Sequence, residues 1–168
     1  MLTISQAESE AQIAAAGELL REYTTWVLTI EGESRQAPTF RGLDEELLTL
    51  PGIYVAPSGR LLLATLDGSA AGCVCLKPHD AITCELKRLY VRPSARGAHI
   101  GGRLVNQLVE EARNAGYRRM VLDSHISMKT AHELYEAAGF VRVSTPDDFP
   151  ESLKPVVVFM ECDLSPQA

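Results

Sequence analysis

The spacing of hydrophobic residues changes along the chain between helical and extended patterns. Apolar positions three and four residues apart predict four helices, at residues 10–29, 43–50, 100–115 and 128–138. Short runs rich in leucine, valine and aromatic residues predict seven strands, at residues 2–5, 60–66, 70–77, 84–91, 120–123, 140–143 and 156–160. The pair Asp67-Gly68 between the second and third strands indicates a two-residue hairpin. Residues 32–42, which include Pro38, are predicted to form a loop.

The order of these elements predicts a single α/β domain. It reads β-α-α-β-β-β-α-β-α-β-β, a run of antiparallel strands followed by strands that alternate with helices. This order is typical of a mixed sheet packed against helices. At 168 residues and 46% hydrophobic content, the chain is long and apolar enough to bury one core without disulfides or metals. We therefore predict one domain over residues 1–168.

Composition and charge argue against several classes of protein. The formal net charge of -6 argues against non-specific binding to nucleic acid. No apolar run approaches the length of a membrane span. The first ten residues carry acidic side chains but no basic one, unlike a signal peptide. Cys73, Cys75, Cys84 and Cys162 form no CxxC pair and lack histidines at metal spacing, so we predict buried reduced thiols, no metal site and a cytoplasmic protein.

The most informative segment is R-G-A-H-I-G-G-R-L at residues 96–104, which follows the predicted strand 84–91. A glycine-rich turn between a strand and a helix points unpaired backbone N–H groups and the positive end of the helix dipole toward one small volume. Between residues 86 and 109 the chain has five basic side chains and no acidic one. The segment therefore predicts a phosphate or pyrophosphate site, with a solvated basic helix start as the alternative. It lacks the sequence signatures of a Walker loop and of a dinucleotide-binding turn.

A second motif lies at residues 131–140, where A-x-x-L-Y-x-x-x-G-F places Ala131, Leu134 and Tyr135 on one face of a helix that ends at Gly139. Together with V-x-P-x-x-R-G-x-x-I-G at residues 91–101, it resembles the GCN5-related N-acetyltransferase (GNAT) superfamily. The first motif resembles that family's loop for the pyrophosphate of acyl-CoA. The second resembles its helix with a tyrosine that faces the CoA sulfur. The element order is similar over nearly the whole chain, and residues 40–63 resemble uncharacterised bacterial members.

The resemblance implies the GNAT fold, an α/β fold whose mixed, mostly antiparallel central sheet is flanked by helices on both faces. It also implies acetyl-CoA as the cofactor and CoA as the product. Two residues depart from the family's pattern: His99 stands where a glycine is usual, and Met128 stands where many members have an asparagine. By their positions in the motifs, the implied cofactor-binding residues are Leu89, Tyr90, Val91, Arg96, Gly97, Ala98, His99, Ile100, Gly101, Gly102, Arg103, Met128, Ala131 and Tyr135.

The resemblance also implies catalytic roles. Tyr135 matches the tyrosine that protonates the departing thiolate; alternatively, it completes the apolar face of its helix. Glu85 lies on the strand that enters the pyrophosphate loop, where some members keep a carboxylate base, and a salt bridge to Lys87 or Arg60 is the alternative. A backbone N–H near Val91 is expected to bind the developing oxyanion. The competing candidates for the base are Asp123, Glu31 and Glu33.

The resemblance therefore implies an acetyl-CoA-dependent N-acetyltransferase that moves an acetyl group to a primary amine of a small molecule or peptide by direct transfer in a ternary complex. A catalytically weak acyl-CoA-binding sensor or regulatory protein is the alternative. Acidic residues near the expected acceptor entrance favour a cationic amine, although solvated loop acids give the same pattern; they are Glu31, Glu33, Asp147, Asp148 and Glu151. Residues 156–160 are apolar enough to suit either a homodimer interface or a central strand.

Overall fold

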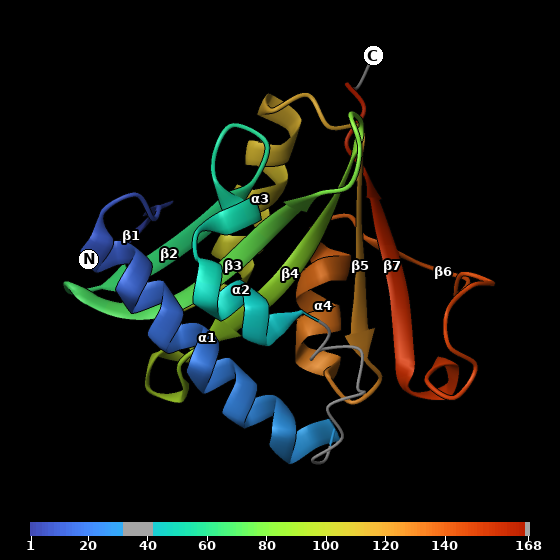
Figure 1. Ribbon diagram of the computed structural model, residues 1–168, viewed down its shortest axis with the longest axis horizontal. Coiled ribbons are helices and arrows are strands. Elements are labelled where there is room, and N and C mark those ends of the chain that lie inside the picture. Colours follow the sequence, from blue (N-terminus) through green and yellow to red (C-terminus); the bar gives the residue numbers. More distant parts are fainter. Residues whose placement is uncertain (32–41, 167–168) are drawn as a thin grey trace.

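The computed structural model describes residues 1–31 and 42–166, which form one sheet with helices on both faces (Figure 1). Within this described part, the sheet has seven strands in the order β1-β2-β3-β4-β5-β7-β6. They are β1 (Leu2–Gln6), β2 (Arg60–Leu66), β3 (Ser69–Pro78), β4 (Thr83–Val91), β5 (Arg119–His125), β6 (Val141–Val143) and β7 (Val157–Asp163). Strands β4 and β5 are parallel, and the other neighbouring pairs are antiparallel. The predicted mixed, mostly antiparallel sheet is confirmed.

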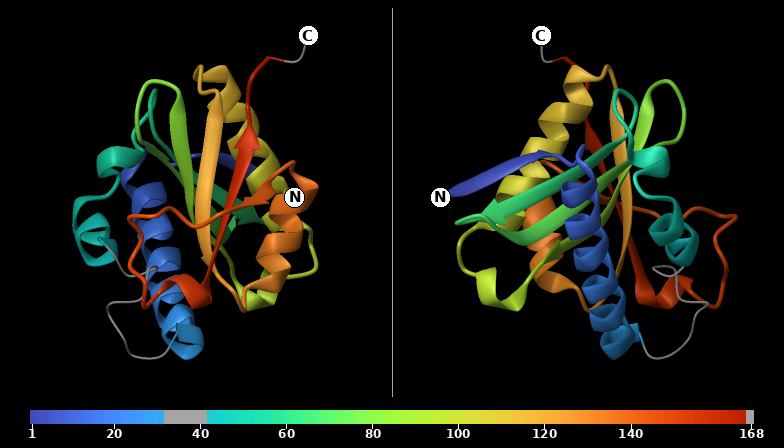
Figure 2. Two further views of the ribbon diagram at one scale, coloured as in Figure 1. Left: turned by 90° about the vertical axis from the view of Figure 1, so that its right-hand side faces the viewer. Right: turned by 60° about the vertical axis from the view of Figure 1, so that its left-hand side comes forward.

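The helices form two layers, one on each face of the sheet (Figure 2). They are α1 (Glu10–Glu31), α2 (Leu43–Thr49), α3 (Ile100–Asn114) and α4 (Lys129–Ala137). Helices α1 and α2 share one buried core with Leu61 and Leu63 of β2. Helices α3 and α4 share the other with Leu62 of the same strand, as alternation along a strand requires. Among the described helices, none is long and apolar enough to cross a membrane.

Strand β4 contains a β-bulge at Arg88. Before this residue Leu86 faces the core under α3 and α4, and after it Leu89 packs against the same core. The register with β3 shifts to match, since Cys75 pairs with Lys87 but Cys73 pairs with Tyr90. Arg88 itself has φ = 60°, in the left-handed region. One extra residue in a strand bends it and increases its local twist.

The bulge coincides with the separation of β4 from β5. The two strands pair only at residues 83–85 of β4 and 119–121 of β5. Beyond Glu85 the described part of β4 has no further pairing with β5, so the strands part. The resemblance implies an oxyanion-binding backbone amide near Val91, at a bulge where two parallel strands part. In the structure the bulge lies at Arg88, three residues earlier in the chain.

Several predicted boundaries shift by a few residues. Phe140 is buried ahead of β6 rather than part of it, because its N–H donates to Tyr135 O and closes the end of α4. Gly139 has φ = 101°, which confirms its role at the helix C-terminus. Strand β7 lies between β5 and β6, so residues 157–160 belong to an interior strand, while Val156 ends the short 3-10 turn before it. Of the loop predicted at residues 32–42, only Gly42 belongs to the described residues.

The cysteines are buried and free, as predicted. Burial raises the pKa of Cys73 and of Cys84 to about 12, so both thiols stay protonated near neutral pH. In the part of the chain that the structure describes, no group of three or more His, Cys, Asp and Glu side chains is placed to hold a metal ion.

Candidate active site

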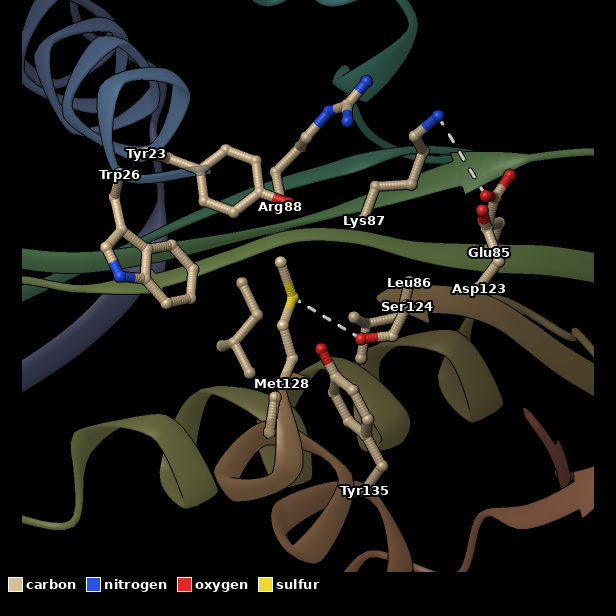
Figure 3. Close-up of a pocket in the computed structure, with 12 residues that line it drawn as sticks. Tyr23, Trp26, Glu85, Leu86, Lys87, Arg88, Asp123, Ser124, Met128 and Tyr135 are labelled. Carbon is tan, nitrogen blue, oxygen red and sulfur yellow. Dashed lines mark hydrogen bonds and ion pairs between the residues drawn. The ribbon is translucent and has the colours of Figure 1, made fainter. Parts of the chain in front are cut away.

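Two adjoining cavities occupy the region where β4 and β5 part. The first, which we call the α3 cavity, has a volume of about 430 Å³ and lies between the end of β4, the N-terminus of α3, and α4. The second, the β4–β5 cavity, has a volume of about 60 Å³ and lies between those two strands, α1 and α4 (Figure 3). Trp26, Leu89 and Ala131 line both cavities, so the cavities meet at these three residues.

Most of the predicted cofactor residues line the α3 cavity. They are Leu89, Tyr90, Val91, Arg96, Gly97, His99, Ile100, Gly101, Gly102 and Ala131. Met128 and Tyr135 line the β4–β5 cavity instead. Ala98 and Arg103 are exposed and line neither of these two cavities. Sequence reasoning missed Trp26, Ala95, Thr130 and Leu134, of which only Leu134 carried a usable signal through its place on the α4 face.

The N-terminus of α3 faces the α3 cavity without a side-chain cap. His99 is the N-cap residue, its side chain makes no capping hydrogen bond, and the first turn holds no acidic residue. The first N–H groups of a helix lack partners within it and carry the positive end of its dipole. His99 has φ = 56°, a conformation that glycine adopts more easily and that costs other residues about 1 kcal/mol. This end of the cavity is therefore suited to an anion such as a pyrophosphate.

The glycines of this turn let α4 pack close to it. A Cβ added at Gly101 would lie 2.8 Å from Leu134 Cδ1, closer than real Cβ atoms come to a neighbour. A Cβ at Gly102 would lie 3.7 Å from Leu134 Cδ2, an ordinary contact. The two adjacent glycines therefore differ sharply in how much side chain they tolerate. The fit of the turn to a backbone cradle depends most on Gly101.

Arg96 is held at the entrance of the α3 cavity by two contacts. Its guanidinium lies 5.8 Å from the centroid of the Trp26 ring, and its Nε donates a hydrogen bond of 3.3 Å to Val91 O. A cation over an indole face is attracted by the ring quadrupole. The exposed guanidinium therefore sits beside the helix N-terminus, where it adds positive charge for an anionic ligand.

Tyr135 enters the β4–β5 cavity from α4. Its ring packs against Phe140 with centroids 5.8 Å apart, and its hydroxyl points toward Ser124 and Met128 (Figure 3). Burial raises the pKa of Tyr135 well above its usual value, and the nearby Tyr23 and Asp123 raise it further. The phenol therefore stays protonated at neutral pH. A protonated hydroxyl fixed by a helix can donate a proton or a hydrogen bond into this cavity.

Two carboxylates line the same cavity, Glu85 from β4 and Asp123 from β5. Glu85 Oε2 lies 2.6 Å from His79 Nε2, and Glu85 Oε1 lies 4.0 Å from Lys87 Nζ. Arg60, the other partner considered from the sequence, pairs with Glu111 at 2.9 Å instead. Of the competing base candidates, Asp123 reaches the cavity, whereas Glu33 and the side chain of Glu31 lie outside the described residues.

The wall of the cavity toward α2 is cationic. Arg88 donates from Nε and Nη2 to Glu46 at 3.0 and 3.2 Å, and Lys87 lies beside it on β4. The acidic residues predicted at the acceptor entrance, Asp147, Asp148 and Glu151, are exposed and line neither cavity. The part of this wall that the structure describes thus combines cations with the carboxylate of Glu46. The other acidic residues predicted at the entrance, Glu33 and the side chain of Glu31, lie outside the described residues.

Ser124 is held by a buried histidine. His132 of α4 is only 2% exposed, and its Nε2 lies 3.1 Å from Ser124 Oγ, which also donates to Met128 Sδ at 3.6 Å. Burial lowers the pKa of His132 below its ordinary value of 6.5, and Arg142 lowers it further. Glu136 and a hydrogen bond to the backbone of His125 act in the opposite direction. The imidazole is therefore neutral at pH 7 and fixes the orientation of Ser124.

The lowered pKa of His132 predicts an acid-sensitive fold. Just below pH 6.5, His132 is protonated in the unfolded chain but stays neutral in the folded chain. The free energy of unfolding therefore decreases as the pH falls below 6.5. A His132→Gln variant retains a hydrogen-bonding side chain but does not titrate. We expect urea denaturation at pH 7.5 and 5.5 to show a smaller loss of stability for the variant than for the wild type. An equal loss in both proteins would contradict the assignment.

Comparison with known proteins identifies the family. A family model described as the acetyltransferase (GNAT) family matches residues 16–140. An uncharacterised N-acetyltransferase of Schizosaccharomyces pombe is 36% identical over 129 residues, which cover 76% of this chain and 77% of that protein. An N-acetylaspartate synthetase of Danio rerio is 31% identical over 109 residues, which cover 64% of this chain and 39% of that protein.

Solved structures share the fold over nearly the whole chain. An acetyltransferase of Streptococcus agalactiae aligns with a TM-score of 0.75 at 20% identity, covering 96% of this chain and 98% of that chain. The PaiA N-acetyltransferase of Thermoplasma acidophilum, solved in complex with coenzyme A, aligns with a TM-score of 0.69 at 20% identity, covering 97% and 99%. With the family match and the two cavities described above, these findings show that the chain belongs to the GNAT family of acetyltransferases.

Proposed function

We propose that this chain transfers the acetyl group of acetyl-CoA to a primary amine of a small molecule, by direct transfer in a ternary complex. The observation that carries the proposal is the meeting of the two cavities at Trp26, Leu89 and Ala131. One cavity is suited to a pyrophosphate, and the other contains a protonated tyrosine and two carboxylates. Two substrates bound side by side can react without a covalent enzyme intermediate, because the cavities bring them into one reactive geometry.

We assign the α3 cavity to acetyl-CoA, which supplies the activated thioester when bound. The first N–H groups of α3 and the guanidinium of Arg96 bind the pyrophosphate. Gly101 keeps the backbone accessible and lets Leu134 pack close to it, since a Cβ there would lie 2.8 Å from Leu134 Cδ1 and force that side chain to move. The neighbour solved with coenzyme A supports this assignment at the level of the fold. Met128 takes the place of the asparagine usual in the family and lines the second cavity.

The residues of the β4–β5 cavity are assigned the proton transfers. Glu85 accepts a proton from the acceptor ammonium, whose pKa near 10 leaves little free amine at neutral pH. Tyr135 donates a proton to the departing sulfur. Backbone amides between Arg88 and Val91 bind the carbonyl oxygen as negative charge develops on it. The β-bulge at Arg88 and the position of Leu89 in both cavities support this placement.

The test of this function is release of CoA in the presence of amines. Purified protein, acetyl-CoA and a panel of primary amines are incubated with a thiol reagent, and acetylated products are identified by mass spectrometry. We expect amine-dependent release of CoA and one acetyl group added at nitrogen. Tight binding of acetyl-CoA without turnover across the panel would favour the acyl-CoA-binding sensor.

We further propose that residues 1–168 form a single N-acetyltransferase domain, that the protein is cytoplasmic and that it forms a homodimer.

A Glu85→Gln variant tests the proposed base. We expect kcat/KM to fall about 100-fold at pH 7, because the amide cannot accept the ammonium proton. The deficit should shrink above pH 9, where solution supplies more of the free amine. The matched control is Glu110→Gln, which removes an exposed carboxylate on α3 that pairs with Arg113. If Glu85→Gln keeps normal activity while Asp123→Asn loses it, the base is Asp123.

A further inference from the structure

Within the part of the chain that the structure describes, Lys87 is a largely buried cation with two long ion pairs and no hydrogen-bonded partner. Its side chain is only 15% exposed, and the nearest carboxylate oxygens, Glu46 Oε1 and Glu85 Oε1, lie 3.9 and 4.0 Å from Nζ. Both distances exceed hydrogen-bond length, and Nζ forms no hydrogen bond within residues 1–31 and 42–166. Glu46 is already bound to the Arg88 guanidinium through two hydrogen bonds. The ammonium of Lys87 therefore has two long ion pairs, but its N–H donors have no acceptor within hydrogen-bond distance in the described residues.

Burying an ammonium group costs free energy when its N–H donors have no hydrogen-bond acceptor, and a bound anion can provide one. Burial lowers the pKa of Lys87, and Arg88 beside it lowers it further, against the opposing effects of Glu85 and Glu46. A charge held in a partly dry cavity gains far more from a direct partner than an exposed one. Lys87 lines the β4–β5 cavity, and Figure 3 shows it on the same side of β4 as Tyr23. A carboxylate bound there could accept the hydrogen bonds that Glu46 and Glu85 are too far away to accept.

The same cavity also carries two carboxylates, Glu85 and Asp123, and Glu85 lies beside Lys87 (Figure 3). We propose that the acceptor is an α-amino acid whose ammonium binds at Glu85 and Asp123 and whose carboxylate binds Lys87. The inference rests on the proposed function and names its substrate class. Glu85 Oε1 and Lys87 Nζ are 4.0 Å apart, which suits an ammonium and a carboxylate carried by one carbon. A polyamine would instead place a second cation against Lys87, and a peptide N-terminus lacks the nearby carboxylate.

The reaction follows from this binding mode. The amino nitrogen forms a bond to the acetyl carbon while the bond from that carbon to sulfur breaks. The ammonium loses two protons in total: one is taken up by the departing sulfur through Tyr135, and the other passes to Glu85 and then to solvent. The products are an N-acetyl amino acid and CoA in its thiol form. The substrate carboxylate bound to Lys87 takes no part in the bond changes, so Lys87 determines which acceptor binds rather than the chemistry.

The experiment compares acceptors that differ only in the carboxylate. The standard L-amino acids are screened for CoA release, and the best is compared with its amide and with its decarboxylated amine. We expect kcat/KM for the amino acid to exceed that for either analogue at least about tenfold, because either analogue leaves the buried ammonium of Lys87 without a hydrogen-bonded anion. In a Lys87→Met variant the ratio should fall to about twofold or less, with the loss appearing chiefly in KM. Lys87→Arg should retain part of the preference.

Lys77→Met is the matched control. Lys77 lies on β3 opposite Glu85 in the strand register, but it does not line the β4–β5 cavity. This variant should keep the wild-type ratio, which separates a bound carboxylate from a general change in local potential. Thermal melting and acetyl-CoA titration show whether each variant is folded. Equal rates with amino acid, amide and amine would overturn the inference and leave the proposed function intact. Absence of turnover with every amine would overturn the proposed function itself.

Discussion

Replacing Tyr135 with phenylalanine is expected to lower kcat about 100-fold while acetyl-CoA still binds, because the change removes only the proposed proton donor of the β4–β5 cavity. The ring remains packed against Phe140, so the shape of α4 is retained. Burial raises the pKa of Tyr135, which keeps the hydroxyl protonated at neutral pH and available to the leaving sulfur. Steady-state kinetics and a calorimetric titration with acetyl-CoA separate the two effects.

Tyr117→Phe is the control for this prediction. Tyr117 is also a buried tyrosine, but its hydroxyl donates to Ser58 O at 2.7 Å, away from both cavities. Loss of that hydrogen bond should cost about 1 kcal/mol of stability and leave kcat close to wild type. Full activity in Tyr135→Phe would mean that Tyr135 only completes the apolar face of α4. Loss of acetyl-CoA binding in Tyr135→Phe would place its role in packing rather than in proton transfer.

A Gly101→Val variant is expected to weaken acetyl-CoA binding about 100-fold. The added Cβ would lie 2.8 Å from Leu134 Cδ1, so Leu134 must move, and Leu134 also lines the α3 cavity. Overpacking of this kind costs about 1–3 kcal/mol, and 2.7 kcal/mol corresponds to about 100-fold in affinity. Valine also blocks the close approach of a pyrophosphate to the backbone. Titration calorimetry with acetyl-CoA measures the loss directly.

Comparison of Gly101→Ala with Gly102→Ala isolates the steric part of this argument. The two variants place the same methyl group on neighbouring residues of one helix turn. At Gly102 the Cβ meets Leu134 Cδ2 at 3.7 Å, an ordinary contact, so its effect on binding should be the smaller of the two. Equal losses at both positions would show that helix flexibility or the pyrophosphate contact, not Leu134, sets the requirement for glycine.

The parts of the site that the sequence predicts are local in the chain. The turn at residues 96–102 and the face of α4 that carries Ala131, Leu134 and Tyr135 each lie within one motif. Their backbone geometry follows from glycine positions and helical spacing, so the contribution of the turn and of Ala131 and Leu134 to the α3 cavity, and of Tyr135 to the β4–β5 cavity, could be predicted before the fold was known. The order of elements along the chain was predictable for a similar reason, because each helix and strand has its own local periodicity. The place of β7 between β5 and β6 was not predicted, because it depends on pairing between distant segments.

The second cavity depends on contacts between distant segments. Trp26 reaches it from α1, and Glu46 of α2 fixes Arg88 across 42 residues of sequence. Neither contact has a local signal. One signal was present in β4: the adjacent charges Lys87 and Arg88 interrupt the alternation of polar and apolar residues, which is the pattern of a bulge. That interruption marks where β4 parts from β5.

Calorimetric titration of the purified protein with acetyl-CoA and with CoA, beside an Arg96→Ala, Gly101→Val double variant, tests the central claim most directly. The assignment of the α3 cavity predicts micromolar binding to the wild type, about -8 kcal/mol, and none measurable in the double variant. Thermal melting should show that the variant remains folded. Equal binding by a folded double variant, or no binding by the wild type, would contradict the assignment of this cavity to acetyl-CoA.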